Sequence, residues 1–245
     1  MGRQVGVMGA GVMGAGIAQV LAVAGHDVVC FDVSEQALAA GAEGVRTGRY
    51  GLESAVQRGK VTAEQSEQAL QRLDFTADRE RLYASDVVIE AVPERLDLKV
   101  TVFRELDRHC RAETVLASNS SGFPICALAA ATDRPDRVIG WHWASPVPVM
   151  RLAEIVRAPS TSDATTQLVV ELAAGAGKNP VVVQDAPTSW GYVSNRVYFA
   201  MVREAARVVQ EGVVTAAEVD QLMVDCFRWP TGPLAMSAGA GSGWS

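Results

Sequence analysis

A histidine and a glutamate stand twelve residues apart in the second half of the chain, His142 in RVIGWHWASP and Glu154 in LAEIVR. Both runs are rich in branched apolar residues, which is typical of buried strands. If the first strand turns and the second runs back beside it, Glu154 lies next to His142. A histidine held by a carboxylate can accept a proton from a substrate hydroxyl. The alternative is a half-buried histidine without a catalytic role, and spacing alone favours neither interpretation.

Three glycines near the N-terminus, Gly9, Gly11 and Gly14, lie between an apolar run and a small-residue stretch in VGVMGAGVMGAGIAQVLA. The pattern predicts strand, glycine turn and helix, which together bind the pyrophosphate of a dinucleotide. Gly9 permits the tight turn, Gly11 lets the phosphates approach the backbone, and Gly14 lets the helix pack against the sheet. N–H groups at the helix N-terminus then face the phosphates. The residues of this turn expected to bind the cofactor are Gly9, Ala10, Gly11, Val12, Met13 and Gly14.

A second apolar run ends at Asp32, eighteen residues after Gly14. A carboxylate there can accept hydrogen bonds from a ribose 2′-hydroxyl, whereas a 2′-phosphate would meet a like charge, so NAD is favoured over NADP. With NAD bound, proton removal by His142 would accompany hydride transfer from the substrate carbon to the nicotinamide. The alternative is a glycine-rich turn that binds nothing.

Apolar runs alternate with helical stretches, which predicts an α/β fold with a Rossmann-like, doubly wound and mostly parallel sheet. The segment 35–72 is helical in pattern and long for a crossover, so we expect it to project as a pair of helices. Polar residues follow three of the predicted strands, which predicts a site at the carboxyl edge of the sheet. These polar segments are Glu90 to Glu94, Ser118 to Ser121, and His142 to Ser145.

The pattern changes after Asp185, where one long helix is expected over 191–211 and a second helix follows a capping box at 215–218. No strand is evident beyond residue 185. We therefore predict an NAD-binding Rossmann domain over 1–187 and a smaller all-α domain over 188–236. The end of the chain, 237–245, is rich in Gly and Ser and is predicted to be a flexible tail.

The composition argues against several classes of protein. The net charge is −6 and no basic block stands out, so nucleic acid is not an expected partner. No run of about eighteen apolar residues suggests a membrane span. Four scattered cysteines and three histidines predict no metal site, and they indicate reduced thiols and a cytoplasmic location.

Five stretches resemble the short-chain L-3-hydroxyacyl-CoA dehydrogenase family, which includes 3-hydroxybutyryl-CoA dehydrogenases. They are GAGVMGAGIAQVLA, VIEAVPERLDLK, LASNSS, VIGWHWASPVPVMRLAEIV and YVSNRVYFAMVREAARVVQEG. The resemblance extends from about residue 3 to residue 236 and implies NAD-dependent oxidation of the 3-hydroxyl of a short acyl thioester, as in fatty acid metabolism. It also implies a homodimer.

The resemblance assigns roles to individual residues. It implies that His142 is the general base and that Glu154 orients it. Ser121 is then expected to touch the substrate hydroxyl and the cofactor, and Asn195 to lie near the substrate carbonyl. Two further residues are expected to contact the cofactor, Glu94 and Lys99.

The chain also departs from the family pattern. HWASP replaces the usual HFFNP, so Ser145 stands where an asparagine contacts the nicotinamide. Trp143 adds bulk that would narrow the substrate site, whereas the scatter of the tryptophans along the chain favours packing in the core or at an interface. Three additional residues, 188–190, lie in the link between the predicted domains. The sequence ends about forty residues before the family's usual end, so the helical domain is expected to be incomplete, completed by a partner chain, or reduced.

Other functions remain open at this level. Relatives of the family oxidise a glyceryl group on an acyl carrier protein in polyketide biosynthesis, or a sugar acid such as gulonate. We interpret three basic residues, Arg49, Arg58 and Lys60, as a solvated helix face rather than a CoA site. Without a clear CoA site, an acyl group on a carrier protein remains an alternative substrate. A protein that binds NAD with little catalysis is a further alternative. A catalytic lysine of the 3-hydroxyisobutyrate dehydrogenase type is disfavoured, because Lys178 directly precedes a predicted strand.

Overall fold

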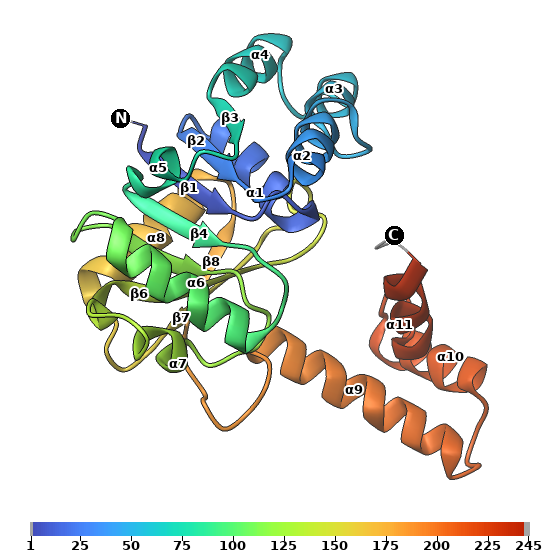
Figure 1. Cartoon of the computed structure of the whole chain (residues 1–245). Helices are drawn as coiled ribbons and strands as arrows, with labels where there is room; N and C mark the ends of the chain where they lie inside the picture. The colour runs from blue at the N-terminus through green and yellow to red at the C-terminus, as the bar shows by residue number, and fades with distance from the viewer. Residues whose placement is uncertain (1, 243–245) are drawn as a thin grey trace. The chain divides into compact units, whose positions relative to one another are not determined.

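The computed structural model describes residues 2–242, and this part of the chain contains an eight-stranded sheet in the order β3-β2-β1-β4-β5-β6-β7-β8 (Figure 1). Neighbouring strands are parallel except for β6 and β7, which are antiparallel, so β7 and β8 run opposite to the other six. The predicted doubly wound, mostly parallel sheet is confirmed. The strands are β1 (Gln4–Met8), β2 (Asp27–Phe31), β3 (Leu73–Thr76), β4 (Val87–Glu90), β5 (Val115–Ser118), β6 (Val138–Trp143), β7 (Leu152–Arg157) and β8 (Asn179–Gln184).

Helices cover both faces of the sheet. On one face, α1 (Val12–Val23) and α8 (Asp163–Gly175) share a buried apolar cluster with the indole rings of β6. On the other face, α5 (Arg79–Tyr83) packs on β1 and β2, and α6 (Leu96–His109) packs on α7 (Ile125–Ala129), which contacts β6. This layering leaves the carboxyl ends of the parallel strands open at one edge, as expected for a ligand site in such a sheet.

The segment predicted as a helical pair contains three helices, α2 (Glu35–Thr47), α3 (Leu52–Gln57) and α4 (Ala63–Gln71). The prediction also missed the edge strand β3 and the short helix α5. Strand β3 has only four half-buried residues, so its apolar pattern is weak, and pairing with β2 rather than local pattern makes it a strand.

The helical unit at the end of the chain contains α9 (Val193–Gln210), α10 (Ala216–Phe227) and α11 (Pro233–Ser242). Helix α10 begins at the predicted capping box, in which Thr215 and Glu218 each accept the other's backbone N–H. The chain divides into compact units at 190/191, three residues after the predicted boundary, and the described part of the second unit contains helices and connecting turns but no strand.

The predicted flexible tail is wrong for 237–242, which belong to α11. Both carboxylate oxygens of Asp220 accept backbone N–H groups from the first turn of α11, those of Leu234 and Ala235, at 2.8 Å each. This cap stabilises a helix that its Gly- and Ser-rich composition does not suggest. The remaining tail residues, 243–245, lie outside the described residues. Within 2–242, no helix is both long and apolar enough to cross a membrane.

Candidate active site

The glycine turn between β1 and α1 has one open position and two packed ones. Gly9 has φ +111°, a backbone conformation that favours glycine. A Cβ at Gly14 would overlap the carbonyl oxygen of Gly9, whereas a Cβ at Gly11 would meet nothing within 4 Å. Helix α1 starts after Gly11 without any side-chain cap. The turn therefore offers bare backbone N–H groups and room beside Gly11, which fits a dinucleotide pyrophosphate.

Asp32 follows β2 and is hydrogen-bonded to the glycine turn itself. Its Oδ2 accepts the backbone N–H of Ala10 at 2.8 Å, and its Oδ1 accepts that of Ser34 at 2.9 Å. The backbone N–H of Gly9 donates to the carbonyl of Phe31 at 2.7 Å. Asp32 therefore supports the shape of the turn in addition to lining the space beside it.

A cavity of about 780 Å³ opens along the carboxyl ends of β1, β2, β4 and β5. Three of the predicted cofactor residues are not among the lining residues that the structure describes. Ala10 and Gly14 shape the glycine turn below the cavity, and the third is Ser145. Phe31 and Arg79, which sequence reasoning missed, form part of the wall, with the Arg79 guanidinium 5.4 Å from the Phe31 ring centre. The predicted cofactor residues that line the cavity are Gly9, Gly11, Val12, Met13, Asp32, Glu94, Lys99 and Ser121.

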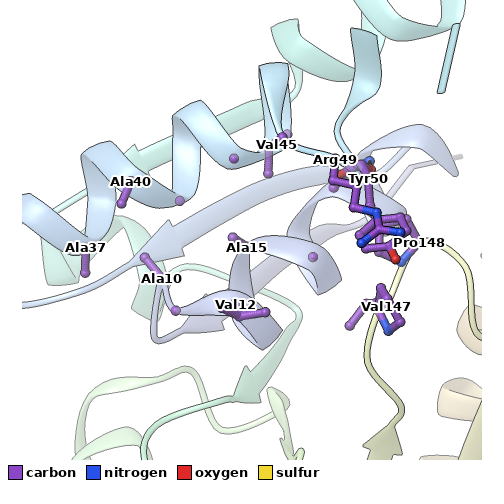
Figure 2. A pocket seen from close by; sticks show the side chains of 17 residues that line it. Ala10, Val12, Ala15, Ala37, Ala40, Val45, Arg49, Tyr50, Val147 and Pro148 are labelled. Atoms are coloured by element: carbon purple, nitrogen blue, oxygen red, sulfur yellow. Dashed lines mark hydrogen bonds between the residues drawn. The ribbon is translucent and has the colours of Figure 1, made fainter. Parts of the chain in front are cut away.

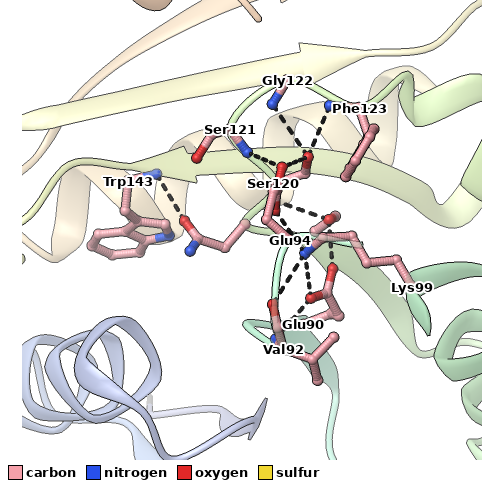
Figure 3. A network of polar contacts seen from close by, with 11 residues as sticks. Glu90, Val92, Glu94, Lys99, Ser120, Ser121, Gly122, Phe123 and Trp143 are labelled. Carbon is pink, nitrogen blue, oxygen red and sulfur yellow. Dashed lines mark hydrogen bonds and ion pairs between the residues drawn. The ribbon is translucent and has the colours of Figure 1, made fainter. Parts of the chain in front are cut away.

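Lys99 is a buried counter-ion for two glutamates (Figure 3). Its Nζ lies 2.7 Å from Oε1 of Glu90 and 3.1 Å from Oε2 of Glu94. Glu90 is fully buried, and Ser118 Oγ also donates to it at 2.7 Å. Burial raises the pKa of Glu90 above its usual value, and the nearby Lys99 ammonium opposes that shift. The sequence placed both glutamates at a strand end, but it carried no sign of this ion pair.

Glu94 in turn holds the loop after β5. Its Oε1 accepts Ser120 Oγ at 2.6 Å and the backbone N–H of Ser121 at 2.9 Å. Asn119 connects the same loop to β6, because its Oδ1 accepts the backbone N–H of Trp143 at 3.0 Å. Ser121 is therefore positioned by a chain of contacts that begins at the buried Lys99 (Figure 3).

His142 and Glu154 are direct partners in the antiparallel pairing of β6 and β7, so the predicted turn and return are confirmed. The Nδ1 of His142 lies 2.7 Å from Oε2 of Glu154, and both side chains are buried. A carboxylate only accepts hydrogen bonds, so Nδ1 carries the proton and Nε2 is the basic nitrogen of the ring. This is the geometry of a histidine held for proton transfer.

Of the two places that the sequence suggested for Trp143, the structure shows the core, so Trp143 adds no bulk on the His142 side of β6. Successive residues of a strand point to opposite faces of the sheet. Trp143 stacks on Trp141 with ring centres 4.8 Å apart, in the core cluster shared with α1 and α8. The altered HWASP motif therefore changes the core, and Ser145 in the loop after β6 is half-buried.

A second cavity of about 370 Å³ lies between α1, α2 and the loop after β6 (Figure 2). The guanidinium groups of Arg49 and Arg58 lie 5.4 and 5.9 Å from the ring centre of Tyr50, so these arginines are organised around an aromatic ring. Arg49 and Tyr50 line this cavity, whereas Lys60 is exposed. Arg49 and Arg58 are exposed as well, so the interpretation as a solvated face is not contradicted, but the sequence did not indicate that Tyr50 lies between the two arginines.

Asn195 lies in the first turn of α9, in the second compact unit. Its expected place near the substrate carbonyl stays a prediction.

Comparison with known families settles the class of protein. Residues 4–186 match the family described as 3-hydroxyacyl-CoA dehydrogenase, NAD binding domain, and residues 191–245 match its C-terminal domain. The chain belongs to the 3-hydroxyacyl-CoA dehydrogenase family. As a member of this family it is an NAD-dependent oxidoreductase that acts on a hydroxyl group.

Individual members of the 3-hydroxyacyl-CoA dehydrogenase family are similar over nearly the whole chain. The chain is 41% identical to a probable 3-hydroxybutyryl-CoA dehydrogenase of Bacillus subtilis, over 96% of this chain and 80% of the relative. It is 39% identical to a 3-hydroxyadipyl-CoA dehydrogenase of Escherichia coli, over 96% of this chain and 48% of the relative. The crystal structure of (S)-3-hydroxybutyryl-CoA dehydrogenase from Ralstonia eutropha is similar with a TM-score of 0.90 and 40% identity, covering 96% and 81% of the two chains.

Proposed function

We propose that this protein oxidises the 3-hydroxyl group of a short 3-hydroxyacyl thioester, with His142 as the general base. The observation that carries the proposal is the 2.7 Å contact between His142 and Glu154, in a sheet whose glycine turn fits NAD. The names of the relatives, most of them 3-hydroxybutyryl-CoA dehydrogenases, support a short acyl group.

The proposed mechanism moves one proton and one hydride. The Nε2 of His142 takes the proton of the substrate hydroxyl, and the oxygen–carbon bond becomes a double bond as the hydrogen on that carbon leaves with its electron pair. When bound, NAD supplies the acceptor for this hydride. Glu154 stabilises the resulting imidazolium, because a carboxylate beside it favours the charged form. The reverse reduction uses the same groups.

Ser121 and Asn195 position the substrate in this proposal. Glu94 and the Ser120 hydroxyl hold the Ser121 loop, which gives the serine a defined place at the cavity wall. Asn195 is assigned to the thioester carbonyl, where its amide N–H would stabilise negative charge on the oxygen.

The acyl carrier in this proposal is coenzyme A. The cavity that holds Arg49 and Tyr50 shares Gly11 and Val12 with the cofactor cavity, so a long substrate could run from one to the other. Two guanidinium groups gathered on Tyr50 offer the positive charge that a phosphorylated carrier needs. A phosphopantetheine arm on a carrier protein carries one phosphate and is the alternative occupant.

We also propose that the protein forms a homodimer through its helical unit. Helices α9 and α10 leave large apolar side chains exposed, among them Val197, Leu222 and Phe227. Such exposed apolar side chains mark interaction surfaces when they are gathered together. The molar mass in solution, measured by light scattering, tests this directly.

The substrate is tested by following NADH formation with the purified full chain, NAD and a panel of substrates. The panel contains L-3-hydroxybutyryl-CoA, a glyceryl-loaded acyl carrier protein and L-gulonate. Turnover with the CoA ester supports the proposal, and turnover with only one of the others replaces the substrate while keeping the chemistry. No turnover with any of the three, in a protein that binds NAD on titration, contradicts the proposed function and favours the non-catalytic alternative.

A further inference from the structure

Lys178 is a buried cation outside the residues assigned to the reaction. It lies just before β8 and only 7% of it is exposed. Its Nζ donates to two backbone carbonyls, those of Val147 at 2.6 Å and Met150 at 2.8 Å. The same ammonium group lies 5.6 Å from the ring centre of Trp143. Its contacts in the described part of the chain are therefore carbonyl oxygens and an aromatic face, without a carboxylate.

A buried charge without a counter-ion is costly unless several groups converge on it. The two carbonyls both belong to the loop 144–151, which joins β6 to β7. That loop connects the strand of His142 to the strand of Glu154 and carries Ser145. Lys178 therefore fixes the connection between the two halves of the proposed proton-transfer pair.

The same loop reaches the cofactor helix. A Cβ added at Gly16 of α1 would lie 3.0 Å from Cβ of Val147, so the loop and α1 are in close contact there. Val147 and Pro148 form one side of the cavity that Gly11 and Val12 also line (Figure 2). A shift of the loop would therefore move a surface that faces the glycine turn.

We propose that Lys178 is a positioning residue, which holds the 144–151 loop against α1 and so fixes His142 and Ser145 relative to the NAD site. The inference rests on the proposed function, because it assigns the loop to the same site. Lys178 acts here through backbone carbonyls on the tryptophan side of β6, and it does not touch the reacting atoms.

The position of Lys178 makes its charge state observable. Burial lowers its pKa to about 8, and the positive charge of Arg151 acts in the same direction. The ammonium group is also the cation beside the Trp143 indole. Loss of its proton removes a charge from the face of that ring, which is expected to change the tryptophan emission.

The first experiment compares Lys178→Met with Arg108→Met in the full-length protein. Arg108 is an exposed residue of α6, so its replacement changes the net charge by the same amount away from the loop. We expect Lys178→Met to lower kcat/KM for L-3-hydroxybutyryl-CoA by about 10- to 100-fold, because the catalytic groups are misplaced. The Arg108→Met variant should retain the wild-type value. Circular dichroism confirms that both variants are folded, and Lys178→Met with wild-type kcat/KM would overturn the proposal.

Tryptic cleavage after Arg151 reports on the loop itself, without any need for turnover. Faster cleavage in Lys178→Met than in Arg108→Met, at equal thermal stability, supports a loop released by loss of the lysine. Equal cleavage rates would contradict it. The Lys178→Arg variant keeps a cation that can donate to both carbonyls, and we expect it to recover part of the protection.

A fluorescence titration of the wild-type protein and of two variants tests the contact between Lys178 and Trp143 without any need for turnover. We expect an emission change with a midpoint near pH 8, absent from Lys178→Met and from Trp143→Phe. An emission change that persists in either variant would contradict the assignment to this pair. If the wild-type protein turns over no thioester, the proposed function fails, while the cleavage and fluorescence measurements still decide whether Lys178 holds the loop.

Discussion

His142 Nδ1 lies 2.7 Å from Glu154 Oε2 because the two residues face each other across the antiparallel pairing of β6 and β7. The carboxylate fixes the tautomer of the ring and leaves Nε2 as its basic nitrogen. Twelve residues of sequence separate the partners, yet the strand register makes them neighbours. This contact and the separate cofactor cavity each lead to measurable consequences.

His142→Gln is expected to lower kcat by about 10²- to 10⁴-fold, because the side chain can no longer accept the substrate proton. NAD should still bind, since His142 does not line the cofactor cavity. Steady-state kinetics and an NAD titration by protein fluorescence measure the two effects. The companion variant Glu154→Gln keeps the shape and should lose less activity, and wild-type turnover in His142→Gln would rule out this base.

Gly11→Ala and Gly14→Ala form a matched pair of single methyl additions in one turn. The Cβ at Gly11 meets no protein atom within 4 Å, so this variant should fold normally and lose NAD affinity by roughly tenfold or more. The Cβ at Gly14 overlaps the Gly9 carbonyl, so that variant should lose stability as well. Thermal unfolding and NAD titration separate the two outcomes. Unchanged NAD affinity in Gly11→Ala would contradict the placement of the pyrophosphate.

Asp32→Asn is expected to narrow the preference for NAD over NADP by roughly tenfold, because a like charge no longer opposes the 2′-phosphate. The asparagine retains one oxygen that can accept the backbone N–H of Ala10 or Ser34, so the turn is partly preserved. Asp32→Ala removes both acceptors and should also weaken NAD binding. The dissociation constants of NAD and NADP measure this preference. If their ratio is the same in Asp32→Asn as in the wild-type protein, Asp32 does not determine the cofactor preference.

Lys99→Met is expected to destabilise the protein by about 3–5 kcal/mol near neutral pH, because Glu90 is left buried without its main counter-ion. The size of the effect should depend on pH. Burial raises the pKa of Glu90, so the folded protein holds that proton more tightly than the unfolded chain, and this group's contribution to stability falls as pH rises above 4.5. Loss of the ammonium raises the pKa further.

The variant should therefore be less destabilised at about pH 5 than at about pH 8. Urea unfolding at both values, with the exposed Lys60→Met as control, measures the difference. An equal loss at both pH values would mean that the charge of Glu90 is not what makes Lys99 necessary.

Much of the fold could be predicted because its signals are local. The glycine spacing and the apolar runs on either side of it follow from backbone conformation and from burial of parallel strands. The capping box at Thr215 is local in the same sense. Strand β3 and helix α11 escaped prediction because a neighbouring strand and the side chain of Asp220 stabilise them from elsewhere in the chain.

The sequence by itself determined which residues are available for chemistry: a glycine turn followed by Asp32, which suits a dinucleotide, and a histidine and glutamate at a spacing that a returning strand can bring together. Only the tertiary structure decided which partners the polar groups take. It pairs Lys99 with Glu90, turns Trp143 into the core, and places Lys178 under the loop after β6. The physical reason is that a buried charge or indole is oriented by strand register and by distant groups, which leave no periodic trace along the chain.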